Sequence, residues 1–284
     1  MHMNARPGRI WVMGALLALA IRPPALSATA ALSSFPDLRQ VQERGVLHVG
    51  LVAKDIPPLL ITGSDGQPAG IEVAMASGLA RRLGVKLQFV RTAATHDELV
   101  TQVAAGEVDV AVSSVTRTIE RAKMVRFSRP YLTQSVAVAL NRVRALQENV
   151  ACPDTPADAA ALASRPGGLG VTRGGAYEQA LRNQDKKINP AVFDTGTELY
   201  AALEADRLLA GLGGEIELRE LFTRHPAARI KLKLCLVGEQ KDQIAIAVRP
   251  DAPNLATWID VVLDSVGLQL KPSGIFDLGT DWSF

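Results

Sequence analysis

The alternation of short β-rich runs with helical segments constrains the fold of this chain more than any other feature. Residues 46–51, 85–90 and 108–112 are rich in valine and leucine, and each is short enough for one strand. Between them, residues 71–83 and 96–105 carry the apolar spacing of helices. Strand–helix–strand units of this length predict a parallel-rich α/β sheet with helices on both faces.

The same alternation of predicted strands and helices begins again after residue 131. Extended segments near 131–135 and 239–243 separate two α/β halves, so the chain is expected to cross twice between them through a two-strand hinge. Lobe 1 is then predicted to comprise residues 36–132 and 244–284, and lobe 2 residues 133–243. Further strands are predicted at residues 134–140, 169–172, 192–193, 207–212, 230–237 and 243–248.

Several residues are typical of helix ends. Thr95 with Glu98 predicts a capping box, and Gly84 is a natural residue to end the preceding helix. Asn254 is expected to cap a last helix that runs to Val266.

The first 30 residues are typical of a signal peptide. Arg6 and Arg9 precede a 12-residue apolar run, and an Ala-Thr-Ala sequence at 28–30 fits a cleavage site. The alternative is a retained anchor, but the run is shorter than the roughly 20 residues that span a bilayer, and Arg22 follows it. We therefore predict residues 1–30 to be removed and the mature chain to be periplasmic and not membrane-embedded.

Charge and composition exclude several function classes. The net charge is +2, and it becomes −1 without the first 30 residues, which hold three arginines and no acid. A chain so near neutrality is a poor candidate for binding nucleic acid. No cluster has metal-ligand spacing and no cofactor motif is present, so neither a metal nor a cofactor is expected.

The two cysteines both fall in the second half of the chain. In an oxidising compartment a pair in one lobe more often forms a disulfide than stays reduced. A bond between Cys152 and Cys235 is therefore predicted, joining the start of lobe 2 to its last strand.

Arg121 occupies an unusual place in its predicted helix. Thr118 is a good N-cap, so Arg121 falls in the first turn, where a cation opposes the helix dipole. A bound anion explains this placement, with Arg121 as a bidentate fork and the hydroxyls of Ser114 and Thr116 as further donors. The alternative is an arginine paired with a neighbouring acid.

Gly174 and Gly175 connect a predicted strand to a helix that begins at Ala176. Neither glycine offers a side-chain cap, so the helix end is expected to leave backbone amides for an anion. An ordinary tight turn is the alternative.

Glu215 and Glu217 follow the strand predicted at 207–212. That edge of an open α/β sheet faces the ligand crevice, where a carboxylate can hold an amine or protonate a leaving group. Acids are also favoured in the first turn of any helix, which is the alternative for at least one of the pair.

Several short motifs in the sequence form one recurring pattern. They are Leu47-His48-Val49-Gly50, Asp55-Ile56-Pro57-Pro58, Gly70-Ile71-Glu72-Val73, Gly106-Glu107-Val108-Asp109, Thr116-x-x-x-Glu120-Arg121 and Phe127-Ser128-x-Pro130-Tyr131. Together they resemble the extracellular solute-binding proteins of polar amino-acid transporters. The resemblance implies the two-lobe, type II periplasmic binding protein fold, a ligand held between the lobes, and a monomer that delivers it to an inner-membrane ABC permease.

The resemblance implies ligand-binding roles for several of these residues in the cleft. Arg121 matches the position that binds the ligand carboxylate, with help from Ser114 and Thr116, and Asp55 is expected near the ligand. The chain departs from the pattern at four places: Leu59 and His96 replace aromatic residues, Gly175 or Ala176 replaces a Ser/Thr, and Gly214 replaces the acid that holds the ligand amine. A carboxylate-bearing small molecule is thus predicted, with an amine recognised only if Glu215 substitutes.

Lobe 2 is also similar to periplasmic cyclohexadienyl dehydratases, which supports an alternative, enzymatic function. Gly174-Gly175-x-Tyr177-Glu178 resembles their glycine turn, the two cysteines match theirs, and Glu217 falls near their catalytic acid. Such an enzyme would hold prephenate through Arg121 and protonate the departing hydroxyl from Glu217. The expected tyrosine and tryptophan of lobe 1 are absent, so the binding protein is the preferred prediction.

Overall fold

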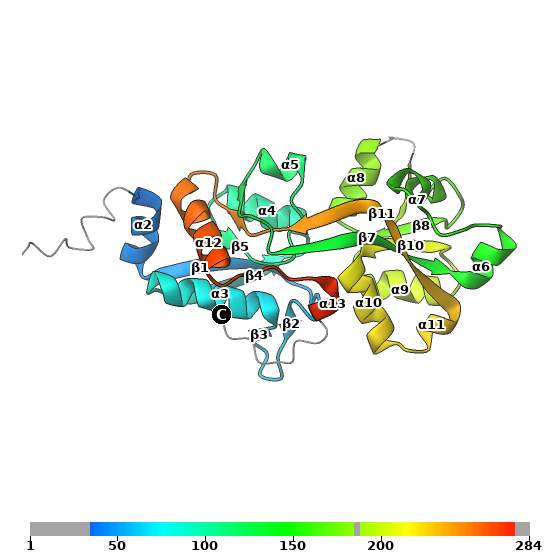
Figure 1. Ribbon diagram of the computed structural model, residues 1–284, viewed down its shortest axis with the longest axis horizontal. Coiled ribbons are helices and arrows are strands. Elements are labelled where there is room, and N and C mark those ends of the chain that lie inside the picture. The colour runs from blue at the N-terminus through cyan, green and yellow to red at the C-terminus, as the bar shows by residue number, and fades with distance from the viewer. Residues whose placement is uncertain (1–34, 185–187, 276–284) are drawn as a thin grey trace, which may run out of the picture.

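The computed structural model describes residues 35–184 and 188–275. The predicted signal peptide, residues 1–30, lies outside the described residues. Two five-stranded sheets, each packed with helices, form two lobes that lie end to end (Figure 1). The predicted two-lobe α/β fold is confirmed. Within the described residues no helix is both long and apolar enough to cross a bilayer.

Lobe 1 contains the sheet built mainly from the first part of the chain. Its strands are β1 (Val46–Val52), β4 (Lys86–Ala93), β5 (Val110–Ala111), β6 (Arg126–Phe127) and β12 (Ala247–Val248), in the order β4-β1-β5-β12-β6. The strands β4 and β5 run parallel to β1, whereas β12 is antiparallel to its two neighbours. Its helices are α2 (Pro36–Arg44), α3 (Ile71–Leu83), α4 (His96–Ala104), α5 (Ile119–Ala122), α12 (Pro253–Ser265) and α13 (Pro272–Ile275), and β2 (Ile61–Thr62) pairs with β3 (Pro68–Ala69) in a small hairpin.

Local sequence signals set the ends of the lobe 1 helices. Gly84 ends α3 in the left-handed conformation, with φ of 71°. The Thr95 side chain accepts a hydrogen bond from the Glu98 backbone N–H, as predicted. The Glu98 carboxylate, however, accepts from the N–H of Ala94 instead of that of Thr95. The predicted capping box is therefore only half formed.

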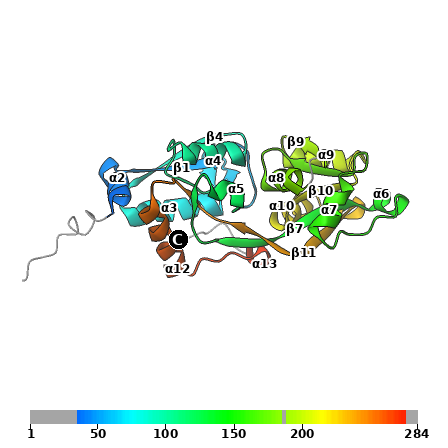
Figure 2. The ribbon, with the colours of Figure 1, turned by 90° about the horizontal axis from the view of Figure 1, so that it is seen from above.

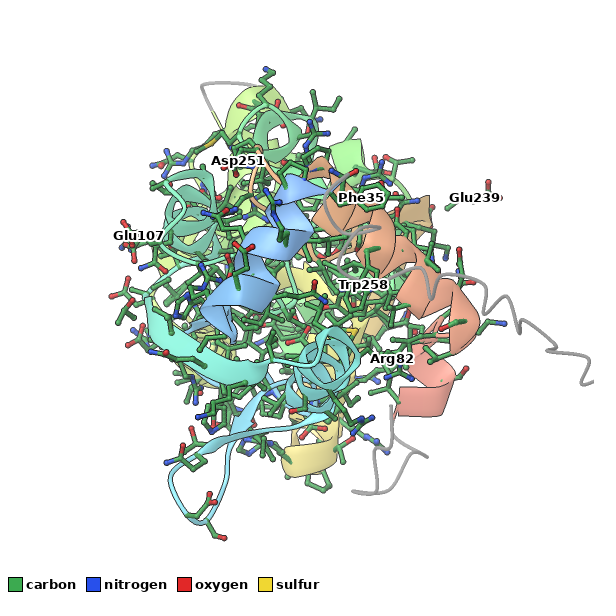
Figure 3. All side chains as sticks on the ribbon, turned by 90° about the vertical axis from the view of Figure 1, so that its left-hand side faces the viewer. Phe35, Arg82, Glu107, Glu239, Asp251 and Trp258 are labelled. Atoms are coloured by element: carbon green, nitrogen blue, oxygen red, sulfur yellow. A yellow bond between two sulfur atoms is a disulfide. The ribbon has the colours of Figure 1, made fainter. Side chains whose placement is uncertain are left out.

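The cap of α12 comes from a distant helix. The prediction that Asn254 caps α12 is wrong, because the Asp37 carboxylate of α2 accepts from the backbone N–H groups of Asn254 and Leu255, at 2.8 and 3.0 Å. Figure 3 looks onto this end of lobe 1, where α2 and α12 lie side by side near Phe35 and Trp258.

Lobe 2 contains the second sheet. Its strands are β7 (Leu132–Asn141), β8 (Leu169–Thr172), β9 (Ala191–Phe193), β10 (Ala210–Gly214) and β11 (Leu232–Ile244), in the order β11-β7-β10-β8-β9. Its helices are α6 (Arg142–Gln147), α7 (Pro156–Leu162), α8 (Ala176–Gln184), α9 (Gly196–Glu204), α10 (Glu215–Arg224) and α11 (Ala228–Lys231). Cys152 and Cys235 form the predicted disulfide, with their Cα atoms 5.6 Å apart.

Two long antiparallel strands, β7 and β11, join the lobes (Figures 1 and 2). They pair from Leu132 with Ile244 to Asn141 with Leu232, with one irregularity between Leu236 and Lys241. Two separate strands form here as predicted, but their predicted bounds, 230–237 and 243–248, are wrong, because β11 continues through to Ile244 and β12 is confined to Ala247–Val248. The hydrogen-bonding partner β7 holds the intervening residues extended, and the local sequence alone does not reveal that partner.

Candidate functional site

A cavity of about 350 Å³ lies between the two lobes, within the size range of small-molecule sites. All the predicted site residues line it except Gly174 and Glu215. The polar and glycine residues that line the cavity include Asp55, His96, Ser114, Thr116 and Arg121 from lobe 1, Gly175, Tyr177 and Glu217 from lobe 2, and Gln134 and Asp242 from the hinge strands.

The lobes are in contact around this cavity. The Lys54 ammonium donates to the Asp194 carbonyl at 3.1 Å, and Arg121 Nη2 approaches the Gly174 carbonyl at 3.5 Å. A Cβ atom at Gly174 would lie 2.5 Å from the Cβ of Thr95, and the φ of Gly174 is +61°. Glycine is therefore required at 174 for this close approach, and the conformation described is closed.

Arg121 is almost completely buried, with 3% exposure, and its backbone is capped by Thr118 as predicted. Its Nη1 donates to the Thr116 carbonyl at 3.1 Å. Its Nε and Nη2 both donate to Asp97 Oδ1, at 3.2 and 2.9 Å. The expectation of a free bidentate fork is wrong, because Asp97 occupies the Nε–Nη2 edge.

The acidic member of the Arg121–Asp97 ion pair is accessible to water. The Asp97 side chain is 46% exposed, so water can solvate its carboxylate if a ligand displaces it. A ligand carboxylate can also bind the remaining Nη1 N–H without displacing Asp97. The sequence indicates a neighbouring acid only as the alternative for Arg121, and it carries no signal for Asp97, which is 24 residues away.

Ser114 is held in a strained conformation by a buried acid. Its φ is +50°, which is uncommon for a non-glycine residue and often marks a functional site. Its backbone N–H and its hydroxyl donate to Glu72 Oε1, at 2.7 and 2.8 Å, and the Tyr131 hydroxyl donates to the same oxygen. Burial raises the pKa of Glu72, although the hydrogen bonds from Tyr131 and Ser114 oppose it. Glu72 therefore positions Ser114 at the cavity wall.

His96 lines the cavity as a neutral imidazole. Burial, together with the charges of Arg121 and Lys54, lowers the pKa of His96 to about 3. Its Nε2 atom is buried and has no hydrogen-bond partner among the described residues. A neutral ring beside two cations can contact a ligand without adding a third positive charge.

We expect substitution of His96 by phenylalanine to reduce the loss of stability in acid. The unfolded histidine gains a proton below pH 6.5, whereas the folded one stays neutral down to pH about 3, so stability is lost over that window. The difference in free energy of unfolding should therefore move in favour of H96F as the pH falls, by up to about 2 kcal/mol between pH 7 and 5. Urea denaturation of both proteins at each pH measures this, and a pH-independent difference would contradict it.

Asp55 lines the cavity, but its carboxylate has partners in lobe 1. It pairs with Arg91 at 2.6 Å and accepts from the N–H and hydroxyl of Thr62. Burial raises the pKa of Asp55, but these hydrogen bonds outweigh it and the net pKa is lowered. Asp55 is thus an ionised wall residue with few free lone pairs for a ligand.

One amide of the glycine turn in lobe 2 is capped by a side chain. The Glu178 carboxylate accepts from the Gly174 N–H at 2.7 Å, so the expectation that this amide is left for an anion is wrong. Only Gly175 of the pair lines the cavity. The local sequence does indicate this hydrogen bond, because Glu178 is four residues beyond Gly174 and a side chain at that position can fold back onto the turn.

Glu215 and Glu217 have different surroundings. The Glu215 carboxylate accepts from Arg219 at 2.7 Å and from the backbone N–H of Ser135, and it does not line the cavity. It therefore does not stand in for an acid at Gly214. Glu217 does line the cavity, and the residue remains exposed. Partial loss of hydration raises the pKa of the Glu217 carboxyl group, and the charge of Lys54 opposes this.

Asp242 is the main site residue that sequence reasoning did not find. It lies on hinge strand β11, is 6% exposed, and accepts from the Tyr177 hydroxyl at 2.8 Å. Burial raises the pKa of Asp242, while hydrogen bonds from Tyr177, Gln134 and Thr116 and the charge of Arg121 oppose this. A single acid in a strand carries no local signal, because only the pairing of β7 with β11 brings it to the cavity.

The sequence of residues 47–268 matches the family of bacterial extracellular solute-binding proteins, family 3. The chain belongs to this family. The resemblance drawn from the cleft motifs is thereby confirmed, and the cavity between the lobes lies where a family 3 protein is expected to hold its solute.

Individual relatives cover most of this family 3 protein. The L-cystine-binding protein TcyJ of Escherichia coli is 26% identical over 275 residues, covering 95% of this chain and 96% of the relative. Cyclohexadienyl dehydratase of Pseudomonas aeruginosa is 28% identical over 219 residues, covering 76% and 75%. The crystal structure of a mutant of the T. maritima protein ArgBP superposes with a TM-score of 0.67 at 27% identity, covering 85% of this chain and 96% of that one.

Proposed function

We propose that this family 3 protein captures an α-amino acid between its lobes in the periplasm and delivers it to an inner-membrane ABC permease. The observation that carries the proposal is the cavity between the lobes, which Arg121, Ser114 and Thr116 line. The guanidinium supplies the charge that a carboxylate needs. The predicted help from the two hydroxyls is not available in this conformation, because the Ser114 hydroxyl donates to Glu72 and the Thr116 hydroxyl donates to Asp242. Relatives named as binding cystine and as arginine-binding proteins support an amino acid as the solute.

Closure around the ligand explains how a permease distinguishes loaded from empty protein. Lys54 and Arg121 of lobe 1 contact backbone carbonyls of lobe 2 at the cavity rim. A ligand that touches both lobes favours the closed state because it binds that state more tightly than the open one.

A thermal-shift screen tests this function. The probes are the twenty common amino acids, L-cystine, 2-keto acids and dicarboxylates. A ligand present at 100 times its dissociation constant stabilises the folded state by about 2.7 kcal/mol, which raises the melting temperature by roughly 5–10 °C for a chain of this size. We expect such a shift for at least one amino acid, and a screen in which none shifts the transition contradicts the proposal.

A dehydratase is the second candidate, and Glu217 is the observation that favours it. Glu217 lines the cavity, and partial loss of hydration raises the pKa of its carboxyl group, as a general acid requires. Incubation with prephenate, followed by the absorbance of phenylpyruvate, distinguishes the two functions. Turnover by the wild type that is lost in E217Q would replace the binding function with the enzymatic one, whereas absence of turnover removes the second candidate.

A further inference from the structure

The position where this family usually carries the acid for the ligand amine is Gly214, and no acid next to it takes over. Glu215 is turned toward Arg219. A carboxylate on a different element, the hinge strand β11, also lines the cavity, and one of its oxygens has no hydrogen-bond partner among the described residues.

Asp242 has one oxygen that is fully used and one that is not. Its Oδ2 accepts from Tyr177 at 2.8 Å, from Gln134 at 3.3 Å and from Thr116 at 3.4 Å. Its Oδ1 is buried and has no hydrogen-bond partner among the described residues. An unsatisfied buried carboxylate oxygen is costly, so a ligand donor that reaches Oδ1 through a small rotation of the Asp242 side chain would be strongly favoured.

The side chain of Gln134 lies close beside Gly214. A Cβ atom at 214 would lie 2.5 Å from Gln134 Nε2, so the Gln134 side chain occupies the space of any larger residue. Gln134 accepts from the Ile216 N–H at the start of α10 and donates to Asp242, its cross-strand neighbour on β11. Gln134 thus fills the usual acid position and holds Asp242 in place.

Thr116 places Asp242 beside the carboxylate-binding arginine. The Thr116 carbonyl accepts from Arg121 Nη1, and its hydroxyl lies 3.4 Å from Asp242 Oδ2. An α-amino acid carries its carboxylate and its ammonium group on one carbon atom. A site for it therefore needs a cation and an anion on neighbouring walls, which is the arrangement of Arg121 and Asp242 around Thr116.

We propose that Asp242 binds the α-ammonium group of the ligand, in place of an acid at position 214. The ligand amine donates to Oδ1, while Oδ2 stays bonded to Tyr177 of lobe 2 and Thr116 of lobe 1. Because these donors come from both lobes, the amine site is complete only in the closed protein. This inference rests on the proposed function, since it requires the solute to be an amino acid.

The test compares amino acids with their deaminated counterparts by calorimetric titration. The probes are L-arginine with 5-guanidinopentanoic acid, and L-cystine with 3,3′-dithiodipropionic acid. Wild type is expected to bind the amino acid at least roughly 30-fold more tightly than its counterpart, because a buried charge pair is lost with the amine. D242N is expected to lose about the same factor for the amino acid and less than about threefold for the counterpart. D264N, an exposed aspartate on α12, serves as the matched control and should behave as wild type.

The possible outcomes separate the two proposals. Equal binding of an amino acid by wild type and D242N overturns the role of Asp242 alone, as does wild type that binds both members of a pair equally. Wild type that binds none of the four probes and no amino acid in the thermal-shift screen overturns the proposed function and the amine site with it.

A second variant covers the case in which D242N does not fold, which circular dichroism will reveal. D242E keeps the charge and the hydrogen-bonding groups but moves the carboxylate by one methylene. It should reduce the preference of the protein for the amino acid over its counterpart by at least tenfold, and an unchanged preference overturns the inference.

Discussion

Replacement of Arg121 by methionine is expected to weaken ligand binding by about 2–5 kcal/mol, the usual cost of removing one partner of a buried charge pair. Arg121 is 3% exposed and lines the cavity, so a ligand carboxylate bound to it is shielded from water. Methionine retains much of the apolar stem, and Asp97, which loses its partner, is 46% exposed and can be hydrated. We therefore expect the fold to persist while affinity falls. Calorimetric titration with the amino acid selected by the thermal-shift screen measures the change.

Two control variants make this result specific. R117M removes a nearby arginine that is exposed and does not line the cavity, and it should bind as wild type does. D97N leaves Arg121 in place but removes its anionic partner, so affinity should stay the same or increase. If D97N lost as much affinity as R121M, the ion pair itself would be the functional unit and a direct contact between Arg121 and the ligand would be disproved.

Removal of the disulfide is expected to produce the second large effect, on stability. Cys152 and Cys235 are separated by 83 positions in the sequence, so their bond restricts a long loop of the unfolded chain. The double variant C152S/C235S should lose about 2–4 kcal/mol in free energy of unfolding. Both sulfur atoms also pack against the core of lobe 2, and serine adds a buried hydroxyl there.

Urea denaturation followed by circular dichroism measures this change. Wild type treated with a thiol reductant should unfold near the same urea concentration as the double variant, whereas reductant should not affect the variant. Because the bond lies within lobe 2, away from Arg121, ligand affinity of the folded variant should remain close to that of wild type. An unchanged unfolding midpoint for the variant would show that the bond contributes nothing to stability.

Most elements of this fold could be predicted because their signals are local. The apolar run of β1, the glycine that ends α3 and the threonine caps of α4 and α5 each depend on residues within one or two turns. The errors arose where a distant partner intervenes. Asp37 caps α12 from more than 200 residues away, and β7 holds β11 extended across the hinge.

In the candidate site, too, the residues could be predicted from local motifs, whereas their contacts with distant residues could not. Arg121, Ser114, Thr116 and His96 belong to segments whose motifs could be identified, and all four line the cavity. Their charge environment could not be predicted from those motifs. The pairing of Arg121 with Asp97 requires α4 and α5 to be neighbours.

By itself the sequence determined the alternation of strands and helices, the two lobes, the cysteine pair and the arginine that faces the cleft. These features follow from periodicity, capping and residue chemistry over short stretches of chain. Only the tertiary structure decided that Asp97 occupies one edge of that arginine, that Gln134 takes the space beside Gly214, and that Asp242 reaches the cavity. Such contacts depend on which strands and helices become neighbours, and on the protection from water that makes a single unpaired carboxylate oxygen significant.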